Sequence, residues 1–461
     1  MKLDLQEILS EASKQREEFE SLLRELIEIP SVSSDPEHES DVHRSADRAA
    51  EIIRQFGGSS SIIHSQTNIP FVHGNFFSAS SKHPTVSVYN HMDVIPASRE
   101  TEPWDTEPFV FTKRGDSYFG RGTTDDKGPA LTALFSARLA QKMGVPINIQ
   151  LLWECEEEVG SPNFAEILRK AGKVVKTDSV VVSDTMWLSR KRPTITAGLR
   201  GFTGIRLLLE TAATDQHSGD VGGAARNPLG ELMKVVCEIY DPQTGHINIP
   251  GFYKDVIAPT KRELQDFMRS GFTSSWFKKT YKFKSMRSDD SLEIMKRIWA
   301  QPTFEIHGVT GGYNGPGLKS IVPPNAEVKA SFRLAPGQDP QKVGRMVREF
   351  VRKKNPDVKT IIYTGSAAYI TQTDGPLADA AKKSIQFAFG LKPVFVREGG
   401  SIGSVISMQQ ILKSPVMFLG LSLPEHGYHA PNENFDWHQA SRGMAAFLYY
   451  FNELSKLRST R

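Results

Sequence analysis

The pattern of apolar and polar positions divides the chain into stretches of different secondary structure. Near the N-terminus an apolar stripe at helical spacing predicts an amphipathic helix that stops at Pro30. The stripe consists of Phe19, Leu22, Leu23, Leu26 and Ile27. Further along, strands are predicted at 85–91, 147–154 and 179–184, and helices at 43–56 and 127–144. This alternation is typical of a mostly parallel sheet with helices on its faces.

The pattern changes near residue 194. Residues 194–210 predict longer, alternating strands that suit a sheet with one exposed face. An amphipathic helix follows, and its apolar side consists of Leu229, Leu232, Val236 and Ile239. A strand at 326–336 and a helix at 339–354 come next, and α/β alternation returns with helices at 376–390 and 439–456. We therefore predict an α/β domain, residues 1–193 and 367–461, interrupted by a smaller α+β domain, residues 194–366.

Composition and charge exclude several classes of protein. The 461 residues are 39% hydrophobic and 24% charged, which predicts a globular chain with a sizeable core. A net charge of +3 gives no general attraction to nucleic acid or anionic lipid. Cys155 and Cys237 alone imply no disulfide framework and favour a reducing cytoplasm. Because no run approaches the roughly 18 apolar residues of a membrane-spanning helix, neither secretion nor membrane insertion is expected.

Side chains that can bind metals follow three of the predicted strands. They are His91 and Asp93 at the first strand, Glu154, Glu156, Glu157 and Glu158 at the second, and Asp184 at the third. Two loops add Asp125 and Asp126 before a helix, and His426 and His429 near the C-terminus. In an open α/β sheet, ligands bind beyond the carboxyl ends of the strands, where these groups would lie together.

Each of these features also has a simple structural explanation. A histidine after a strand is usually a satisfied polar residue, an aspartate pair before a helix is usually a cap, and an acidic strand end is usually a solvated edge. Their joint occurrence at three strands and two loops is harder to explain by chance. Two histidines and three carboxylates match the mixed ligands of zinc and similar ions, and paired ions about 3.5–4 Å apart need a bridging carboxylate. The spacing alone leaves both explanations open.

Longer stretches of sequence resemble one enzyme family. They are, in order, "NHMDV", "PWDTEPF", "YFGRGTTDDKGP", "EEEVGS", "VVSDTMW", "TITAGLRG", "DQHSGDVGG", "KSIVPPNAEVKASFRLAP", "REGGSI" and "GYHAPNENF". Together they resemble the co-catalytic metallopeptidase family that includes carnosinase, cytosolic non-specific dipeptidase, aminoacylase, succinyl-diaminopimelate desuccinylase and glutamate carboxypeptidase. The resemblance covers nearly the whole chain, and "TDDKGP" and "ITAGLRG" are most similar to the carnosinase and non-specific dipeptidase branch.

The resemblance implies a pair of divalent metal ions in each subunit. His91 and Asp184 would hold one ion, Glu158 and His429 the other, and Asp125 would bridge them. Asp93 would orient His91, and Glu157 would be the general base. The peptide bond after Asp125 would be cis. Zinc is the first expectation for the metal, with manganese or cobalt as alternatives, since all three accept these ligands.

Other positions would act on the substrate. By resemblance, His217 would lie in the neighbouring subunit's active site and stabilise the oxyanion, and Arg333 would bind the substrate carboxylate. Glu398, Gly399, Gly400 and Ser401 would line the substrate site. The inserted domain would serve as a lid and dimerisation domain, which makes a homodimer the expected state. The apolar stripe of the helix near residue 232 fits such an interface, and packing on its own sheet explains it equally well.

Four functions follow from these observations. The first is a cytoplasmic dipeptidase that hydrolyses short peptides with a free C-terminal carboxylate, using metal-activated water and Glu157 as base. The second is an N-acyl amino acid deacylase with the same site. A non-catalytic peptide-binding scaffold would be expected to lack a ligand or the base, whereas every proposed ligand, Asp93 and Glu157 are present. A single structural zinc would predict one metal ion per chain and no peptidase activity.

Overall fold

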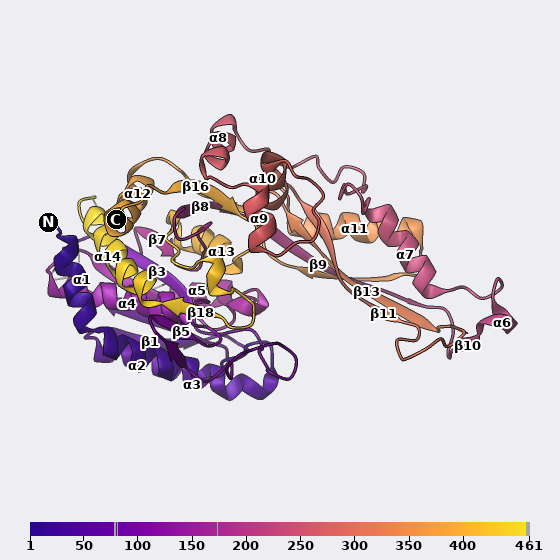
Figure 1. Cartoon of the computed structure of the whole chain (residues 1–461), viewed down its shortest axis with the longest axis horizontal. Coiled ribbons are helices and arrows are strands. Elements are labelled where there is room, and N and C mark those ends of the chain that lie inside the picture. Colours follow the sequence, from indigo (N-terminus) through magenta and orange to yellow (C-terminus); the bar gives the residue numbers. More distant parts are fainter. Residues whose placement is uncertain (78–79, 81, 173, 458–461) are drawn as a thin grey trace.

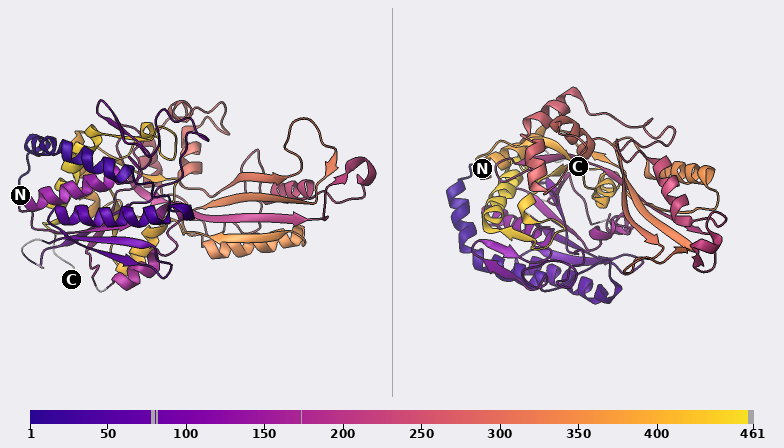
Figure 2. Two further views of the ribbon diagram at one scale, coloured as in Figure 1. Left: turned by 90° about the horizontal axis from the view of Figure 1, so that it is seen from below. Right: turned by 45° about the vertical axis from the view of Figure 1, so that its right-hand side comes forward.

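A six-stranded sheet and a four-stranded sheet organise the chain. The computed structural model describes residues 1–77, 80, 82–172 and 174–457. The six-stranded sheet lies inside a rounded body that also holds the first and last helices, and the four-stranded sheet extends from this body as a long arm (Figure 1). The view from below shows the same arm extending from the body (Figure 2, left). Every helix of the described residues is too short or too polar to cross a membrane.

The sheet of the body is mostly parallel, as predicted. Its order is β1 (Ser59–His64), β2 (Pro70–Phe76), β6 (Asn148–Glu154), β3 (Thr85–His91), β7 (Ser179–Val182) and β17 (Val416–Phe418). The last four strands pair in parallel, whereas β2 runs antiparallel to both β1 and β6. The parallel strands therefore present their carboxyl ends at one edge of the sheet.

Both faces of this sheet are covered by apolar clusters. Neighbouring side chains along a strand point to opposite sides, so one strand contributes to both clusters. Val86 and Val88 of β3 belong to one apolar cluster, and Tyr89 belongs to the cluster on the other face. The first face is covered by α1 (Leu5–Lys14), α2 (Arg16–Ile27), α3 (Glu39–Gln55), α4 (Lys127–Lys142), α12 (Pro376–Phe389) and α14 (Trp437–Leu454). The second is covered by α5 (Phe164–Ala171) and α13 (Gly403–Leu412).

The arm is an antiparallel sheet with two helices on one face. The strand order is β11 (Thr303–Gly311), β13 (Asn325–Leu334), β9 (Gly201–Glu210) and β14 (Lys359–Thr364). The helices are α7 (Pro228–Ile239) and α11 (Pro340–Lys354). Leu232, Val236 and Ile239 of α7 are buried in one cluster with residues of β9 and β13, and Leu229 packs against it. Of the two explanations for this stripe, the structure shows packing on its own sheet.

A smaller sheet joins the two parts. The predicted strands at 194–210 are β8 (Thr194–Leu199) and β9, and they belong to different sheets. β8 pairs with β15 (Tyr369–Ile370) on one side and β16 (Val394–Glu398) on the other, and all its residues are buried, with Ile195 and Ala197 in one apolar cluster and Leu199 in another. The helices α8 (Lys261–Arg269) and α10 (Ser291–Trp299) contact β16, and α9 (Ser274–Thr280) lies beside α10 (Figure 1). The domain boundaries at residues 193 and 366 stay predictions.

The remaining short elements lie around these sheets. They are β4 (Thr112–Arg114), β5 (Ser117–Phe119) and β18 (Asn434–Asp436) in one sheet, and β10 (Gln216–His217) and β12 (Ile321–Val322) in another. The short helix α6 (Ser218–Val221) follows β10. Single turns of 3₁₀-helix are η1 (Pro36–His38), η2 (Glu157–Val159) and η3 (Pro424–His426). The turns η2 and η3 lie directly after β6 and shortly after β17, at the edge where the parallel strands end.

Candidate metal centre

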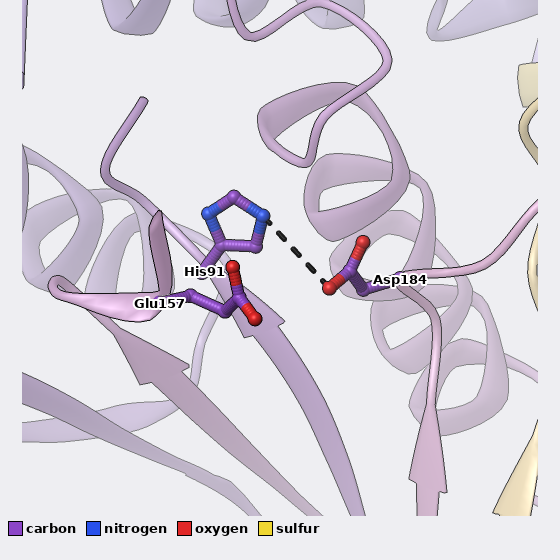
Figure 3. A group of neighbouring side chains, drawn as sticks. All are labelled: His91, Glu157 and Asp184. Atoms are coloured by element: carbon purple, nitrogen blue, oxygen red, sulfur yellow. Dashed lines mark ion pairs between the residues drawn. The ribbon is translucent and has the colours of Figure 1, made fainter. Parts of the chain in front are cut away.

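The carboxyl ends of the adjacent parallel strands bring three candidate side chains together. His91 is the last residue of β3, Glu157 lies in the turn after β6, and Asp184 follows β7. Their side chains point toward one another from these three places (Figure 3). The Nε2 atom of His91 lies 4.0 Å from an Oδ atom of Asp184, and the three residues form one group whose ligand atoms could hold a metal ion.

Asp125 lies between two histidines. One of its carboxylate oxygens is 2.9 Å from Nε2 of His91, and the other is 2.9 Å from Nε2 of His429. The same nitrogen of His429 is 3.2 Å from a carboxylate oxygen of Glu158. Two groups of three ligands therefore share one aspartate, His91 with Asp184 and His429 with Glu158. This donor set fits two divalent cations bridged by a carboxylate.

Asp93 organises the side chains around it through hydrogen bonds. Its backbone oxygen lies 3.0 Å from Nδ1 of His91, and its carboxylate accepts hydrogen bonds of 3.1 Å from the backbone N–H groups of Glu157 and Glu158. Because His91 bonds through Nδ1, its Nε2 atom is left to face Asp125. Asp93 thus holds the His91 ring through its backbone oxygen, whereas its carboxylate, 3.4 Å from Nδ1, holds mainly the turn that carries both glutamates.

The electrostatics of the site show that the chain alone holds an excess of acid. Burial, and then Asp184, raise the pKa of Glu157 well above its usual value. Burial, and then Asp125, raise the pKa of Glu158 to about 7. Burial lowers the pKa of His429, but hydrogen bonds to Asp125 and Glu158 outweigh it and raise that pKa to about 11. Closely spaced buried carboxylates need compensating positive charge, which two divalent cations would supply.

The other two glutamates of the acidic run are structural. Glu154 accepts a hydrogen bond of 2.6 Å from the Tyr89 hydroxyl, and burial raises its pKa to about 8. Glu156 accepts hydrogen bonds from the backbone and side-chain nitrogens of Asn163, at 2.6 and 2.8 Å. Both side chains are buried, so the acidic strand end is not a solvated edge. Their hydrogen bonds satisfy polar groups that would otherwise be costly to bury.

Glu433 and Arg121 hold the turn that carries Asp125, and sequence reasoning missed them. One carboxylate oxygen of Glu433 accepts hydrogen bonds from the N–H groups of Thr124 and Asp125, at 2.9 and 3.1 Å. The other accepts from the Gly122 N–H at 3.0 Å and from Arg121 at 2.7 Å. Both glutamate and arginine are buried. They lie 312 positions apart in sequence, so spacing gives no sign of this pair.

The peptide bond between Asp125 and Asp126 is cis, as the resemblance implied. Tyr428, another residue that sequence reasoning missed, donates a hydrogen bond from its hydroxyl to a carboxylate oxygen of Asp184. His429 follows it with a φ of +53°, a left-handed conformation that is uncommon outside glycine. The loop after β17 therefore contributes both a candidate ligand and a group that orients one.

His426 and Lys127 lie near the site, but their side chains bind other parts of the protein rather than the candidate metal ligands. His426 is buried, and its Nε2 atom lies 3.0 Å from a carboxylate oxygen of Asp436. The ammonium of Lys127 donates hydrogen bonds to the backbone oxygens of Leu26 and Ile29, at 2.8 and 3.0 Å. Lys127 therefore connects the start of α4 to the end of α2, rather than capping its own helix or pairing with Asp126.

The candidate metal centre opens into a cavity of about 490 Å³. It is lined by Asp125, Glu157, Asp184 and His429, and by the expected substrate residues Arg333, Glu398, Gly399, Gly400 and Ser401. Arg333 donates a hydrogen bond of 3.0 Å to the Ser401 hydroxyl, and its guanidinium lies 5.2 Å from the ring centre of Phe202. Burial raises the pKa of Glu398 to about 8. The structure thus places all five expected substrate residues in the cavity of the candidate metal ligands.

His217 lies far from that cavity in its own chain. It is part of β10, which pairs with β12 at the distal end of the arm (Figure 1). Its side chain is 64% exposed, and Nδ1 accepts a hydrogen bond of 3.1 Å from the Gly219 N–H. A role for His217 in catalysis would therefore require the arm of another copy of the chain.

Comparisons with known proteins agree with this geometry. The chain is 31% identical to Cys-Gly metallodipeptidase dug1 of Schizosaccharomyces pombe, over 99% of this chain and 100% of the relative. It is 30% identical to the Beta-Ala-His dipeptidase of Homo sapiens, over 81% of this chain and 75% of that protein. The solved structure of the di-peptidase Dug1p from Saccharomyces cerevisiae aligns with a TM-score of 0.89 and 29% identity, and covers 98% of this chain and 99% of that one.

The family assignment rests on most of the chain. The family model of peptidase family M20/M25/M40 matches residues 87–453, a range that includes all the candidate metal ligands. The relatives confirm the resemblance to the carnosinase and dipeptidase branch, because one is named a Cys-Gly metallodipeptidase and another a Beta-Ala-His dipeptidase. The chain therefore belongs to peptidase family M20/M25/M40, and it is a metal-dependent peptidase.

Proposed function

We propose that the protein is a dipeptidase that hydrolyses short peptides with a free C-terminal carboxylate. The observation that carries this proposal is the Asp125 carboxylate, whose two oxygens each lie 2.9 Å from a different histidine in a cavity that also holds Arg333. The volume of about 490 Å³ suits a small ligand rather than a protein chain. The relatives named above act, by their names, on Cys-Gly and Beta-Ala-His, which are both dipeptides.

We assign the metal ligands as two triads. His91, Asp125 and Asp184 would hold one cation, and His429, Asp125 and Glu158 the other, on the distances given above. Zinc is the proposed metal, with manganese and cobalt as alternatives, because the donors are imidazole and carboxylate. When bound, such a pair activates water as a nucleophile and polarises the amide carbonyl of the substrate.

Glu157 is the proposed general base. It accepts the proton of the attacking water and delivers it to the leaving nitrogen, while the carbon–nitrogen bond of the amide breaks. Its position beside His91 and Asp184 supports this role, since the three side chains face one another (Figure 3). Its N–H group is held by Asp93, which fixes the carboxylate relative to the ligands. Arg333 is proposed to bind the substrate carboxylate with its guanidinium.

The deacylase alternative uses the same groups, because an N-acyl amino acid also presents an amide and a carboxylate. The relatives favour the dipeptidase, and we keep it as the first proposal. We also propose the cytoplasm as the compartment, supported by the two free cysteines, one of which is exposed. Unpaired exposed thiols are typical of reducing compartments.

We further propose a homodimer in which the inserted domain, predicted at residues 194–366 and including the arm, acts as lid and dimerisation domain. The exposed side chain of His217 at the end of the arm supports this, because it lies away from the cavity of its own chain. A second copy could place its His217 at this chain's cavity, where an imidazole N–H could stabilise the oxyanion.

Replacing Glu157 by Gln should lower kcat by about 10²- to 10⁴-fold, the usual contribution of a general base, while metal content stays unchanged. Steady-state kinetics and elemental analysis of the purified variant measure both. Glu156→Gln is the matched control, because Glu156 bonds to Asn163 and should leave the rate near that of the wild type. Full turnover in Glu157→Gln would reject the assigned base.

Replacing Arg333 by Ala should raise KM for dipeptides by roughly 10- to 100-fold, as expected for a lost charged hydrogen bond. A dipeptide amide, which has no terminal carboxylate, should be hydrolysed equally by the variant and the wild type. The exposed Arg345 on α11 provides the control substitution Arg345→Ala. Hydrolysis of acetylated amino acids without cleavage of any dipeptide would favour the deacylase, and an equal effect on the amide would exclude carboxylate binding by Arg333.

Mixing two inactive variants tests the role of His217. His217→Ala should lower kcat by about 10²- to 10³-fold, as for the loss of one oxyanion donor. Coexpression with Glu157→Gln should restore about a quarter of wild-type activity, because about half of the dimers are mixed and each has one complete site. No recovery in verified mixed dimers would contradict a contribution from the neighbouring subunit.

A further inference from the structure

One wall of the cavity described above is aromatic. Trp276 and Phe277 of α9, and Tyr281 and Phe283 of the segment after it, line the same cavity as Asp125 and Glu157. We call these four aromatic residues the aromatic wall. The helix α9, which carries two of these residues, lies beside α10 between the body and the arm (Figure 1). Neither the metal centre nor the proposed carboxylate site uses these residues.

The aromatic wall rests on a second, buried layer of rings. Phe272 is buried, and its ring centre lies 5.6 Å from that of Trp276 and 5.2 Å from that of Phe277. The ring centre of Trp299 of α10, a largely buried residue that also lines the cavity, lies 5.6 Å from that of Phe272. Ring pairs at these separations have the geometry of packed aromatic contacts. The wall is therefore a supported surface, with its rear layer fixed in a hydrophobic cluster.

The front of the wall is exposed in the cavity. Tyr281 and Phe283 are 48% and 42% exposed, and their rings are stacked with an interplanar angle of 16°. Phe277 contacts both, with ring centres 4.9 and 5.4 Å away. Burial, and then the Glu398 carboxyl, raise the pKa of Tyr281, which agrees with its phenol being near the polar side of the cavity. Several exposed aromatic side chains in one cavity are typical of a binding surface.

We propose that the aromatic wall is a side-chain subsite that selects peptides with a large apolar or aromatic residue. This rests on the proposed peptidase function and specifies its substrate class. Leu188 and Ile298 extend the apolar surface beside the wall. A small side chain such as that of glycine would leave these rings facing water, whereas a phenylalanine or leucine side chain would cover them. Full burial of such a side chain corresponds to roughly 10- to 100-fold in kcat/KM.

The position of the wall next to the metal centre favours a substrate side chain over a partner protein. The aromatic rings and the four candidate metal-centre residues line one cavity, so a group that binds the wall is adjacent to the reacting bond. A second copy of the chain could instead cover Tyr281 and Phe283. In that case, replacing Tyr281 or Phe283 by Ala would change the oligomeric state and leave substrate selectivity unaltered. Measuring both properties therefore distinguishes a substrate side chain from a second copy of the chain.

The test uses the metal-loaded enzyme with two series of dipeptides, Ala-X and X-Ala, where X is Gly, Ala, Leu or Phe. We expect kcat/KM to rise by roughly 10- to 100-fold from Gly to Phe in at least one series. Equal rates throughout both series would overturn the subsite while leaving the peptidase function intact. Hydrolysis of none of these peptides would instead reject the proposed function.

Two variants and a matched control complete the experiment. Tyr281→Ala and Phe283→Ala should each lower kcat/KM for the Phe and Leu peptides more than for Ala-Ala, and so remove most of the preference for large side chains. Tyr363→Ala is the control, since Tyr363 is 49% exposed on β14 and does not line the cavity. Sedimentation of each variant should match the wild type. Unchanged selectivity in both wall variants, or a changed oligomeric state with unchanged selectivity, would overturn the proposal.

Discussion

The contact on which the site depends is the carboxylate of Asp125 between His91 and His429. The two histidines come from opposite parts of the chain, and Asp125 lies 2.9 Å from each of them. Its own position depends on Glu433, which binds the backbone of the turn through Gly122, Thr124 and Asp125. A buried carboxylate that accepts this many hydrogen bonds fixes the turn more firmly than a single contact would. One buried glutamate thus holds the turn that carries the proposed bridging aspartate.

The same edge of the sheet explains why four glutamates can follow a buried strand. Glu157 and Glu158 face the candidate ligands, whereas Glu154 and Glu156 face inward to Tyr89 and Asn163. Each carboxylate has a separate partner, so like charges are kept apart or are set where cations would compensate them. The backbone separates the two pairs, since Glu154 ends β6 and Glu156 precedes the turn η2, whereas Glu157 and Glu158 lie within that turn.

Much of the fold and of the candidate site could be predicted from the sequence. The helical and strand periods identified β3, β6, β7 and α4 within a few residues, and the strand-end rule placed His91 and Asp184 together. The expectation of one exposed face for residues 194–210 was wrong for β8, which is buried throughout and pairs with β16 from near the other end of the chain. The pairing of Arg121 with Glu433 and the aromatic wall were also missed. The pair joins residues 312 positions apart, and the place of the wall in the cavity of Asp125 depends on how residues 276–283 pack against the rest of the chain. Local periodicity encodes neither.

The most direct test of this account is to count and locate the metal ions. Elemental analysis of the purified, metal-loaded enzyme should give two divalent ions per chain, and anomalous scattering from a crystal should place them on either side of Asp125, one beside His91 and the other beside His429. The Asp125→Ala variant should lose this pair. A single ion, or two ions bound away from Asp125, would contradict the bridged centre and the hydrolysis mechanism that depends on it.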